Sequence, residues 1–250
     1  MSARNLCSFA VLTFAGVLVL KISTVQLKGL ASPGSQTRDT VFSIHASLRP
    51  ARQPASSPSR PTVLPIQFKN PKDLATGKLL VASRGLGDPN FAGTVILLVH
   101  YDADGVVGLV LNRRTDFPLS RALDLKAAKD RSDRIYFGGP VGTRSVFALL
   151  ESTAKAEGAE HVVGAVYLIS SKTLFEQTIS KQPDPALFHV YLGYAGWNPE
   201  QLRKEVELGA WFIFPGDAAV VFDSHPDSLW PRMIHKTELE LASVERAPRL

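Results

Sequence analysis

The chain has 250 residues, of which 45% are hydrophobic, and its 28 basic and 23 acidic residues give a net charge of +5. This length and hydrophobic content are sufficient for a packed globular domain. Residues 1–70 hold eight basic residues and one acidic residue, whereas the remainder holds 20 basic and 22 acidic residues, so a surface for the phosphate backbone of nucleic acids is not indicated for the folded part.

The first segment is an uncharged run of fifteen residues from Leu6 to Leu20, preceded by Arg4 and followed by Lys21. A membrane-spanning helix needs about 20 apolar residues, so this run has the length of a signal-peptide core. Two alternatives remain open: a permanent membrane anchor, and a cytoplasmic or organelle-targeted protein whose start is misassigned or whose leader is a transit peptide. We expect an exported or membrane-anchored protein of the bacterial cell envelope.

Small residues mark the end of this leader. Gly29 and Ala31 occupy the positions that a signal peptidase prefers before a cut, which predicts a leader over residues 1–31. The sole cysteine, Cys7, lies within it, so the folded part can form neither a disulfide nor a thiolate metal site.

A linker follows the leader. Residues 32–68 are rich in proline, serine and arginine and show no sustained hydrophobic period, which predicts a disordered tether. We therefore expect a folded domain over residues 69–243 and a short tail over residues 244–250.

Strand patterns begin after Gly77. Lys78 to Ser83 and Thr94 to Tyr101 are apolar and rich in β-branched residues, and the turn sequence Asp102 to Gly105 leads into Val106 to Leu111. Two strands joined by so tight a turn must be antiparallel.

Helix signals occur between the strands. Asn198 is a typical N-cap, Pro199 suits the first helical position, Gln201 is placed for a capping box, and Gly209 supplies the end. Similar patterns predict further helices near 118–128, 171–180 and 226–236. Because strands and helices do not alternate strictly, the expected fold class is α+β.

Eight sequence blocks lie in order between residues 74 and 236: Gly77–Ala82, Asp88–Phe91, Gly105–Arg113, Gly138–Val141, Leu192–Trp197, Gly209–Trp211, Val221–Asp223 and Leu229–Trp230. Together they resemble the AlgH/YqgE family. The resemblance implies a bifurcated, mostly antiparallel sheet curled into a pseudo-barrel with helices outside. It also implies an uncharacterised family that is commonly labelled as transcriptional regulators. The chain departs from the family pattern at Ser83–Arg84 and at Asn112–Arg114.

The candidate binding residues lie within these blocks. Gly138 and Gly139 follow a predicted strand and could form a backbone nest for an anion, although a tight turn that allows close backbone packing is favoured. Asp88, Asn112 and Arg113 are polar candidates for a ligand or active site, together with Asp223 in the closing block.

Other motifs favour structural interpretations. The loop that begins at Asp102 lacks the glutamate of a calcium site, and the Ser152-x-x-Lys155 pair stands in a polar run without the partner motifs of its enzyme class. His100 and His189 lie in strand-like runs and are expected to be satisfied structural residues. The aromatic series Tyr191, Tyr194 and Trp197 is expected to pack in the core. No catalytic residue, metal site or cofactor is predicted.

Three functional hypotheses follow. The favoured one is a non-catalytic regulatory or protein-interaction module with an unknown protein partner, which would contact a membrane only through an uncleaved leader. The second is an enzyme or small-ligand-binding protein with a site near Asp88, Asn112 and Arg113. The third, a nucleic-acid-associated regulator, is disfavoured by the slight negative charge of the domain. A structure that gathered Asp88, Asn112, Arg113 and the Gly138 turn into one pocket would favour the second hypothesis.

Overall fold

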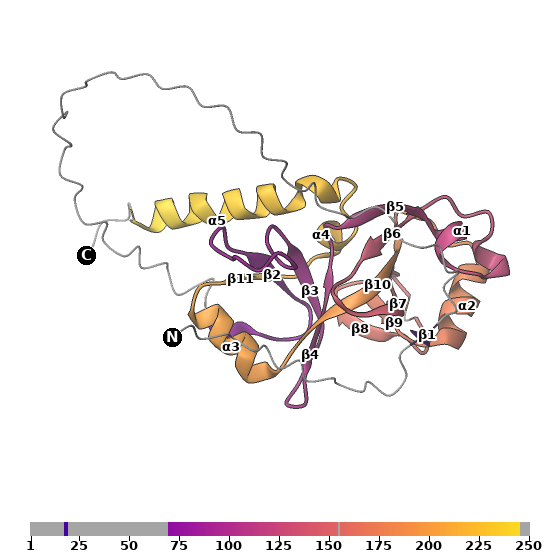
Figure 1. Cartoon of the computed structure of the whole chain (residues 1–250), viewed down its shortest axis with the longest axis horizontal. Helices are drawn as coiled ribbons and strands as arrows, with labels where there is room; N and C mark the ends of the chain where they lie inside the picture. Colours follow the sequence, from indigo (N-terminus) through magenta and orange to yellow (C-terminus); the bar gives the residue numbers. More distant parts are fainter. Residues whose placement is uncertain (1–17, 20–69, 155, 246–250) are drawn as a thin grey trace, which may run out of the picture. The chain divides into compact units, whose positions relative to one another are not determined.

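The computed structural model describes residues 18–19, 70–154 and 156–245, all within one compact unit of the chain (Figure 1). Apart from Leu18–Val19, the expected leader and linker lie outside the described residues. The described elements are β1 (Leu18–Val19), η2 (Pro71–Asp73), β2 (Lys78–Ala82), β3 (Val95–Tyr101), β4 (Val106–Val110), β5 (Arg114–Pro118), α1 (Leu119–Ala122), η3 (Lys126–Ala128), β6 (Arg134–Phe137), β7 (Val141–Glu151), β8 (Glu160–Val163), β9 (Val166–Ile169), α2 (Lys172–Ser180), β10 (Phe188–Trp197), α3 (Pro199–Glu207), β11 (Trp211–Pro215), α4 (Ala218–Val221), η4 (Pro226–Ser228) and α5 (Leu229–Glu245).

The strands form one curled sheet. Its main path runs β11-β2-β3-β4-β10-β7-β9-β8, and every neighbouring pair on this path is antiparallel. Strand β6 joins β10 in parallel, β5 pairs with β6, and β1 pairs with β7. The expected α+β class with a mostly antiparallel, curled sheet is confirmed.

The sheet divides at β10. Tyr191 and Leu192 pair with β6, whereas Ala195 to Trp197 pair with β4, on the edge of β10 opposite to β7. The register shifts between Leu192 and Tyr194, so Gly193 stands where the two branches separate. This division is the bifurcation that the family resemblance implies.

One face of the sheet holds the main core, here called the inner cluster. Strand β3 shows why both of its faces are apolar: Val95, Leu97 and Val99 belong to this inner cluster, while Ile96 and Leu98 face an outer layer. Side chains alternate between the faces of a strand, so a strand covered on both sides reads as a continuous apolar run. The inner cluster also includes residues of α5, which crosses one side of the sheet (Figure 1).

Helix α3 covers the outer face near β2, β3, β4 and β11. Leu202 and Val206 pack there, as their i and i+4 spacing predicts. Glu205 Oε2 accepts hydrogen bonds from the indole nitrogens of Trp197 at 3.2 Å and Trp211 at 2.8 Å. The expectation that Trp197 packs in the core is confirmed.

The predicted helix ends of α3 are also confirmed. The Asn198 side chain accepts a hydrogen bond from the Glu200 backbone N–H at 2.9 Å, and Gly209 follows the helix with a φ of 79°. Gln201, however, donates its side chain to Glu205 at 2.9 Å and does not form the predicted capping box.

Two predicted helices have different lengths in the structure. The helix expected at 118–128 is divided into α1 and η3, because Leu123 and Leu125 are extended and Leu123 is buried in an outer cluster. The helix expected at 226–236 begins with η4, and α5 continues to Glu245, since residues 237–245 contain no glycine or proline. None of the helices in residues 70–154 and 156–245 is long and apolar enough to cross a bilayer.

Candidate functional site

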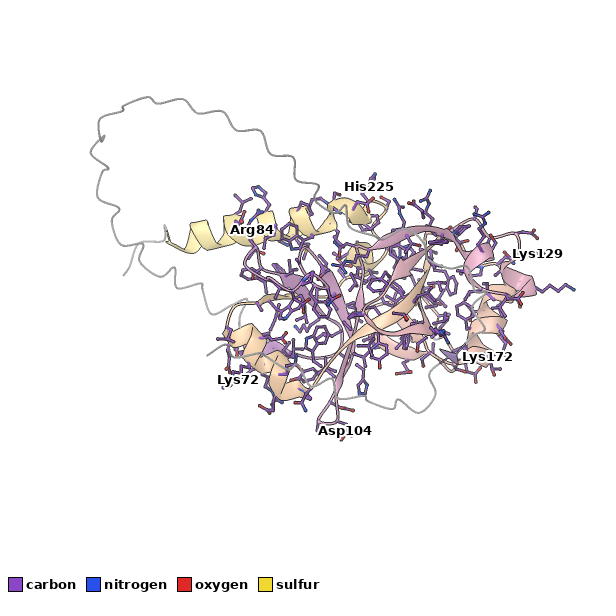
Figure 2. The ribbon with its side chains drawn as sticks, in the orientation of Figure 1. Lys72, Arg84, Asp104, Lys129, Lys172 and His225 are labelled. Atoms are coloured by element: carbon purple, nitrogen blue, oxygen red, sulfur yellow. The ribbon has the colours of Figure 1, made fainter. Side chains whose placement is uncertain are left out.

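An open cleft of about 390 Å³ lies beside the branch formed by β5 and β6. Its walls come from these strands, from the start of β10 and from the segment after α4. His225, which Figure 2 labels, comes directly after this last segment and locates that side of the domain. The lining side chains with polar or aromatic chemistry include Arg114, Arg134, Tyr136, His189, Phe222 and Asp223.

Strand pairing brings these residues together. Arg114 of β5 is opposite Tyr136 of β6, and Tyr136 is next to Tyr191 of β10. His189 lies two residues before Tyr191, so both side chains point to the same side of β10. The fold thus gathers these lining residues, which are up to 109 positions apart in the chain, from Arg114 to Asp223.

One wall of the cleft is aromatic. The ring of His189 stacks on Tyr136 with centroids 4.7 Å apart and an interplanar angle of 27°. The centroid of the same imidazole lies 5.0 Å from that of the Phe222 ring, and the two rings are tilted by 56°. Because each ring is packed against another, the wall has a defined shape before any ligand binds.

His189 is a polar residue in this wall. Burial lowers the pKa of His189 to about 4, with Arg114 acting in the same direction, while a hydrogen bond to the Val221 backbone and the charge of Asp133 oppose the shift. The imidazole is therefore neutral at pH 7, and its buried Nδ1 has no hydrogen-bond partner among the described residues. The sequence-based expectation of a satisfied structural histidine holds for the hydrogen bond to the Val221 backbone but not for Nδ1, because strand periodicity predicts burial but not the partner of each ring nitrogen.

The phenol groups are also kept neutral. Burial raises the pKa of Tyr136, while Arg114 partly opposes this shift, and burial raises the pKa of Tyr191 well above its ordinary value. The Tyr191 hydroxyl, like His189 Nδ1, is buried without a described hydrogen-bond partner.

Charged groups surround the aromatic wall. Arg114 Nη2 lies 3.6 Å from Asp227, and Arg134 pairs with Asp116. Asp223 is 2.5 Å from Arg232, and although burial raises the pKa of Asp223, the hydrogen bonds from Arg232 and the His225 backbone hold it below its ordinary value. Asp223 is thus ionised at neutral pH, and the positive charge of Arg232 balances its negative charge.

Arg131 fixes two loops that border the cleft, those of Asp133 and Pro183. This side chain is only 5% exposed and makes two hydrogen bonds to Asp133, at 2.9 and 3.0 Å. It also donates to the Pro183 carbonyl at 2.8 Å and lies over the ring of Phe188. A buried, bidentate arginine of this kind joins two loops rigidly.

The residues predicted from the sequence lie elsewhere, except Asp223. Asn112 accepts a hydrogen bond from the Val95 N–H and donates one to the Gly93 carbonyl, both at 2.9 Å. Arg113 donates to the Pro89 carbonyl at 3.3 Å, and burial lowers its pKa while Asp88 raises it. The structure thus brings Asp88, Asn112 and Arg113 together around the 85–94 loop, outside the cleft.

Replacing Asn112 with alanine is expected to destabilise the domain by about 2 kcal/mol, because two partly buried backbone groups lose their partners. Urea denaturation would measure the change in the free energy of unfolding. Asn90→Ala is a matched control in the same loop: Asn90 is exposed, so this change should stay within about 0.5 kcal/mol. Equal effects of the two substitutions would contradict the clamping role of Asn112.

Gly138 and Gly139 lie at the division of the sheet. The Gly138 N–H donates to the Leu192 carbonyl at 2.8 Å, and its carbonyl accepts from the Val110 N–H at 2.9 Å. A Cβ at Gly138 would be 2.3 Å from the Gly193 oxygen. These glycines therefore serve close backbone packing, the interpretation favoured from the sequence, and the Gly138 N–H is not available to an anion.

Among residues 70–154 and 156–245, no three histidine, cysteine, aspartate or glutamate side chains are grouped so as to hold a metal ion.

Comparison with known proteins identifies similar sequences. Residues 79–242 match the family model described as AlgH-like. A UPF0301 protein from Streptomyces avermitilis is 34% identical over 180 residues, which cover 69% of this chain and 92% of the relative. A UPF0301 protein from Thiobacillus denitrificans is 34% identical over 173 residues, covering 68% and 93% respectively.

Two solved structures share the fold. The solution structure of the AlgH protein from Pseudomonas aeruginosa has a TM-score of 0.54 and 27% identity, and the match covers 79% of this chain and all of that one. A crystal structure of a Corynebacterium diphtheriae protein has the same TM-score at 20% identity, covering 66% and 87% of the two chains.

Proposed function

The chain belongs to the AlgH-like family, and we propose that its domain is a non-catalytic regulatory module that binds a small molecule in the cleft beside β5 and β6. The observation that carries the proposal is the cleft itself, with its aromatic wall and converging polar groups. Ligand sites of proteins are concave, largely preformed and lined by aromatic side chains with a few placed polar groups.

The cleft is held in shape before binding. The Tyr136–His189–Phe222 stack fixes the aromatic wall, and the hydrogen bonds of Arg131 fix two loops that border the cleft. A site that is rigid in the free protein loses little conformational entropy on binding, which favours affinity.

The titratable groups favour binding over proton transfer. A general acid or base works best when its pKa is near the working pH. His189, with a pKa of about 4, is a weak base, and the raised pKa of Tyr136 makes its phenol a weak acid. Both groups keep one protonation state at neutral pH, so each keeps the same hydrogen-bond donors and acceptors.

The proposal is tested by blocking the cleft. Ala186 lines it and is exposed, so Ala186→Trp should fill the space without unfolding the domain. Ligand-observed NMR on the full chain with a defined mixture of carboxylates, phosphate esters, nucleosides and sugars should show compounds that bind wild type and not the variant. Ala75→Trp, at an exposed position outside the cleft lining, is the matched control and should bind like wild type.

Three results would contradict the proposal in whole or in part. If no compound binds, or if Ala186→Trp binds the same compounds as wild type, the cleft is not the site of binding. Recovery of a bound compound in chemically altered form would contradict the non-catalytic part of the proposal.

A further inference from the structure

Arg114 and Arg134 line the cleft and can form ion pairs with a bound anion. Arg114 and Arg134 pair with Asp227 and Asp116, and the side chains of these aspartates are 75% and 96% exposed. Ion pairs with so exposed a partner stabilise a protein little, because water solvates both groups well. A ligand anion can therefore replace Asp227 and Asp116 at low cost.

The carboxylates that line the cleft do not cancel this positive charge. Asp133 is bound by the buried Arg131 through two hydrogen bonds, and Asp223 is bound by Arg232. Because each carboxylate already has an arginine of its own, Arg114 and Arg134 remain as the positive groups that face a ligand.

The aromatic wall selects the shape of the uncharged part of a ligand. Tyr136, His189 and Phe222 present packed rings on the same side of the cleft as Arg114. Flat rings are attracted to such a surface in offset-stacked or edge-to-face arrangements.

We propose that the cleft binds a planar organic anion, whose carboxylate or phosphate group pairs with Arg114 and Arg134 while its ring packs against Tyr136, His189 and Phe222. This inference deepens the proposed function and rests on it. Arginine suits the task because its planar, forked donors match the oxygens of a carboxylate or a phosphate.

Four probes test the inference by calorimetry on the full chain: naphthoate, naphthyl phosphate, the uncharged naphthamide, and inorganic phosphate. Both aromatic anions should bind, and each should bind at least about tenfold more tightly than naphthamide or inorganic phosphate. Naphthamide lacks the charge-assisted pair, and inorganic phosphate lacks the ring contact. The order of naphthoate and naphthyl phosphate identifies which anionic group the arginines prefer.

Variants assign the charge to its residues. Arg114→Gln and Arg134→Gln should each weaken the aromatic anions by about tenfold and leave naphthamide unchanged. Arg144→Gln, an exposed arginine of β7 that does not line the cleft, is the matched control and should bind like wild type. All three side chains are exposed, so the variants should keep the wild-type melting temperature.

The outcomes separate the inference from the proposed function. If naphthamide binds as tightly as naphthoate and Ala186→Trp abolishes both, the cleft binds ligands but the anion preference is wrong. Unchanged binding in both Arg114→Gln and Arg134→Gln would overturn the assignment of the arginines. If none of the four probes binds, the inference fails, and the screen with the defined mixture then decides whether the proposed function fails with it.

Discussion

Replacing Gly139 with alanine is expected to destabilise the domain by about 4 kcal/mol, combining overpacking with backbone strain. A Cβ at this position would lie 2.2 Å from the Tyr194 carbonyl carbon and 2.4 Å from the Ala195 nitrogen. Both are backbone atoms of β10 and cannot move aside without separating paired strands. The φ of Gly139 is also 153°, a conformation that side chains disfavour.

Two glycines provide controls that separate these causes in urea denaturation. Gly164→Ala should cost about 1 kcal/mol, because its φ of 54° is strained for alanine but no atom lies within 4 Å of the added Cβ. Gly87→Ala adds a Cβ in open space without a positive φ and should change stability by less than about 0.5 kcal/mol. A Gly139→Ala cost no larger than that of Gly164→Ala would contradict the close approach of the strands.

Much of the fold could be predicted because its signals are local. The apolar runs of β2, β3 and β4, the turn at Asp102 and the start of α3 at Asn198 each depend on a few neighbouring residues. The Gly138–Gly139 turn was favoured as a place of close packing for the same reason. Its partner Gly193 is 54 residues away from Gly139, so the division of the sheet followed from the family resemblance rather than from the local pattern.

The cleft could not be predicted in the same way. It joins β5, β6, β10 and the segment after α4, and the parallel pairing of β6 with β10 has no signal in either strand alone. Of the sequence candidates, only Asp223 lines it. Asn112 and Arg113 are site candidates because they are polar residues after an apolar strand. Such residues can also form hydrogen bonds with the backbone of a loop, as both do here.

One signal in the sequence did point to the cleft. His189 and Tyr191 alternate with Phe188 and Val190, so a histidine and a tyrosine face one side of a strand whose other side is apolar. Two neighbouring polar aromatic residues on a buried strand face indicate either a hydrogen-bond network or a ligand site. The sequence alone leaves these alternatives open, because the residues opposite that face come from distant segments.

His189 makes the stability of the domain depend on pH. In the unfolded chain a histidine has an ordinary pKa near 6.5, whereas in the folded domain burial lowers the pKa of His189 to about 4. Between these values the unfolded state binds the proton and the folded state does not, so stability is complete above pH 6.5 and is lost as the pH falls toward 4. The expected loss from pH 7 to pH 4 is about 3 kcal/mol, of which about 2 kcal/mol occurs by pH 5.

The range from pH 7 to pH 5 separates this effect from the carboxylates, which in unfolded chains titrate near pH 4. Urea denaturation of wild type and His189→Phe at both pH values would measure it. Phenylalanine keeps a ring against Tyr136 and Phe222 but cannot bind a proton, so the variant should lose about 2 kcal/mol less than wild type over this range. Equal losses would mean that His189 is solvated in the folded protein. The packing of Tyr136 and Phe222 against His189 both buries the imidazole and shapes the aromatic wall. A solvated His189 would therefore also contradict the rigid wall on which ligand binding depends.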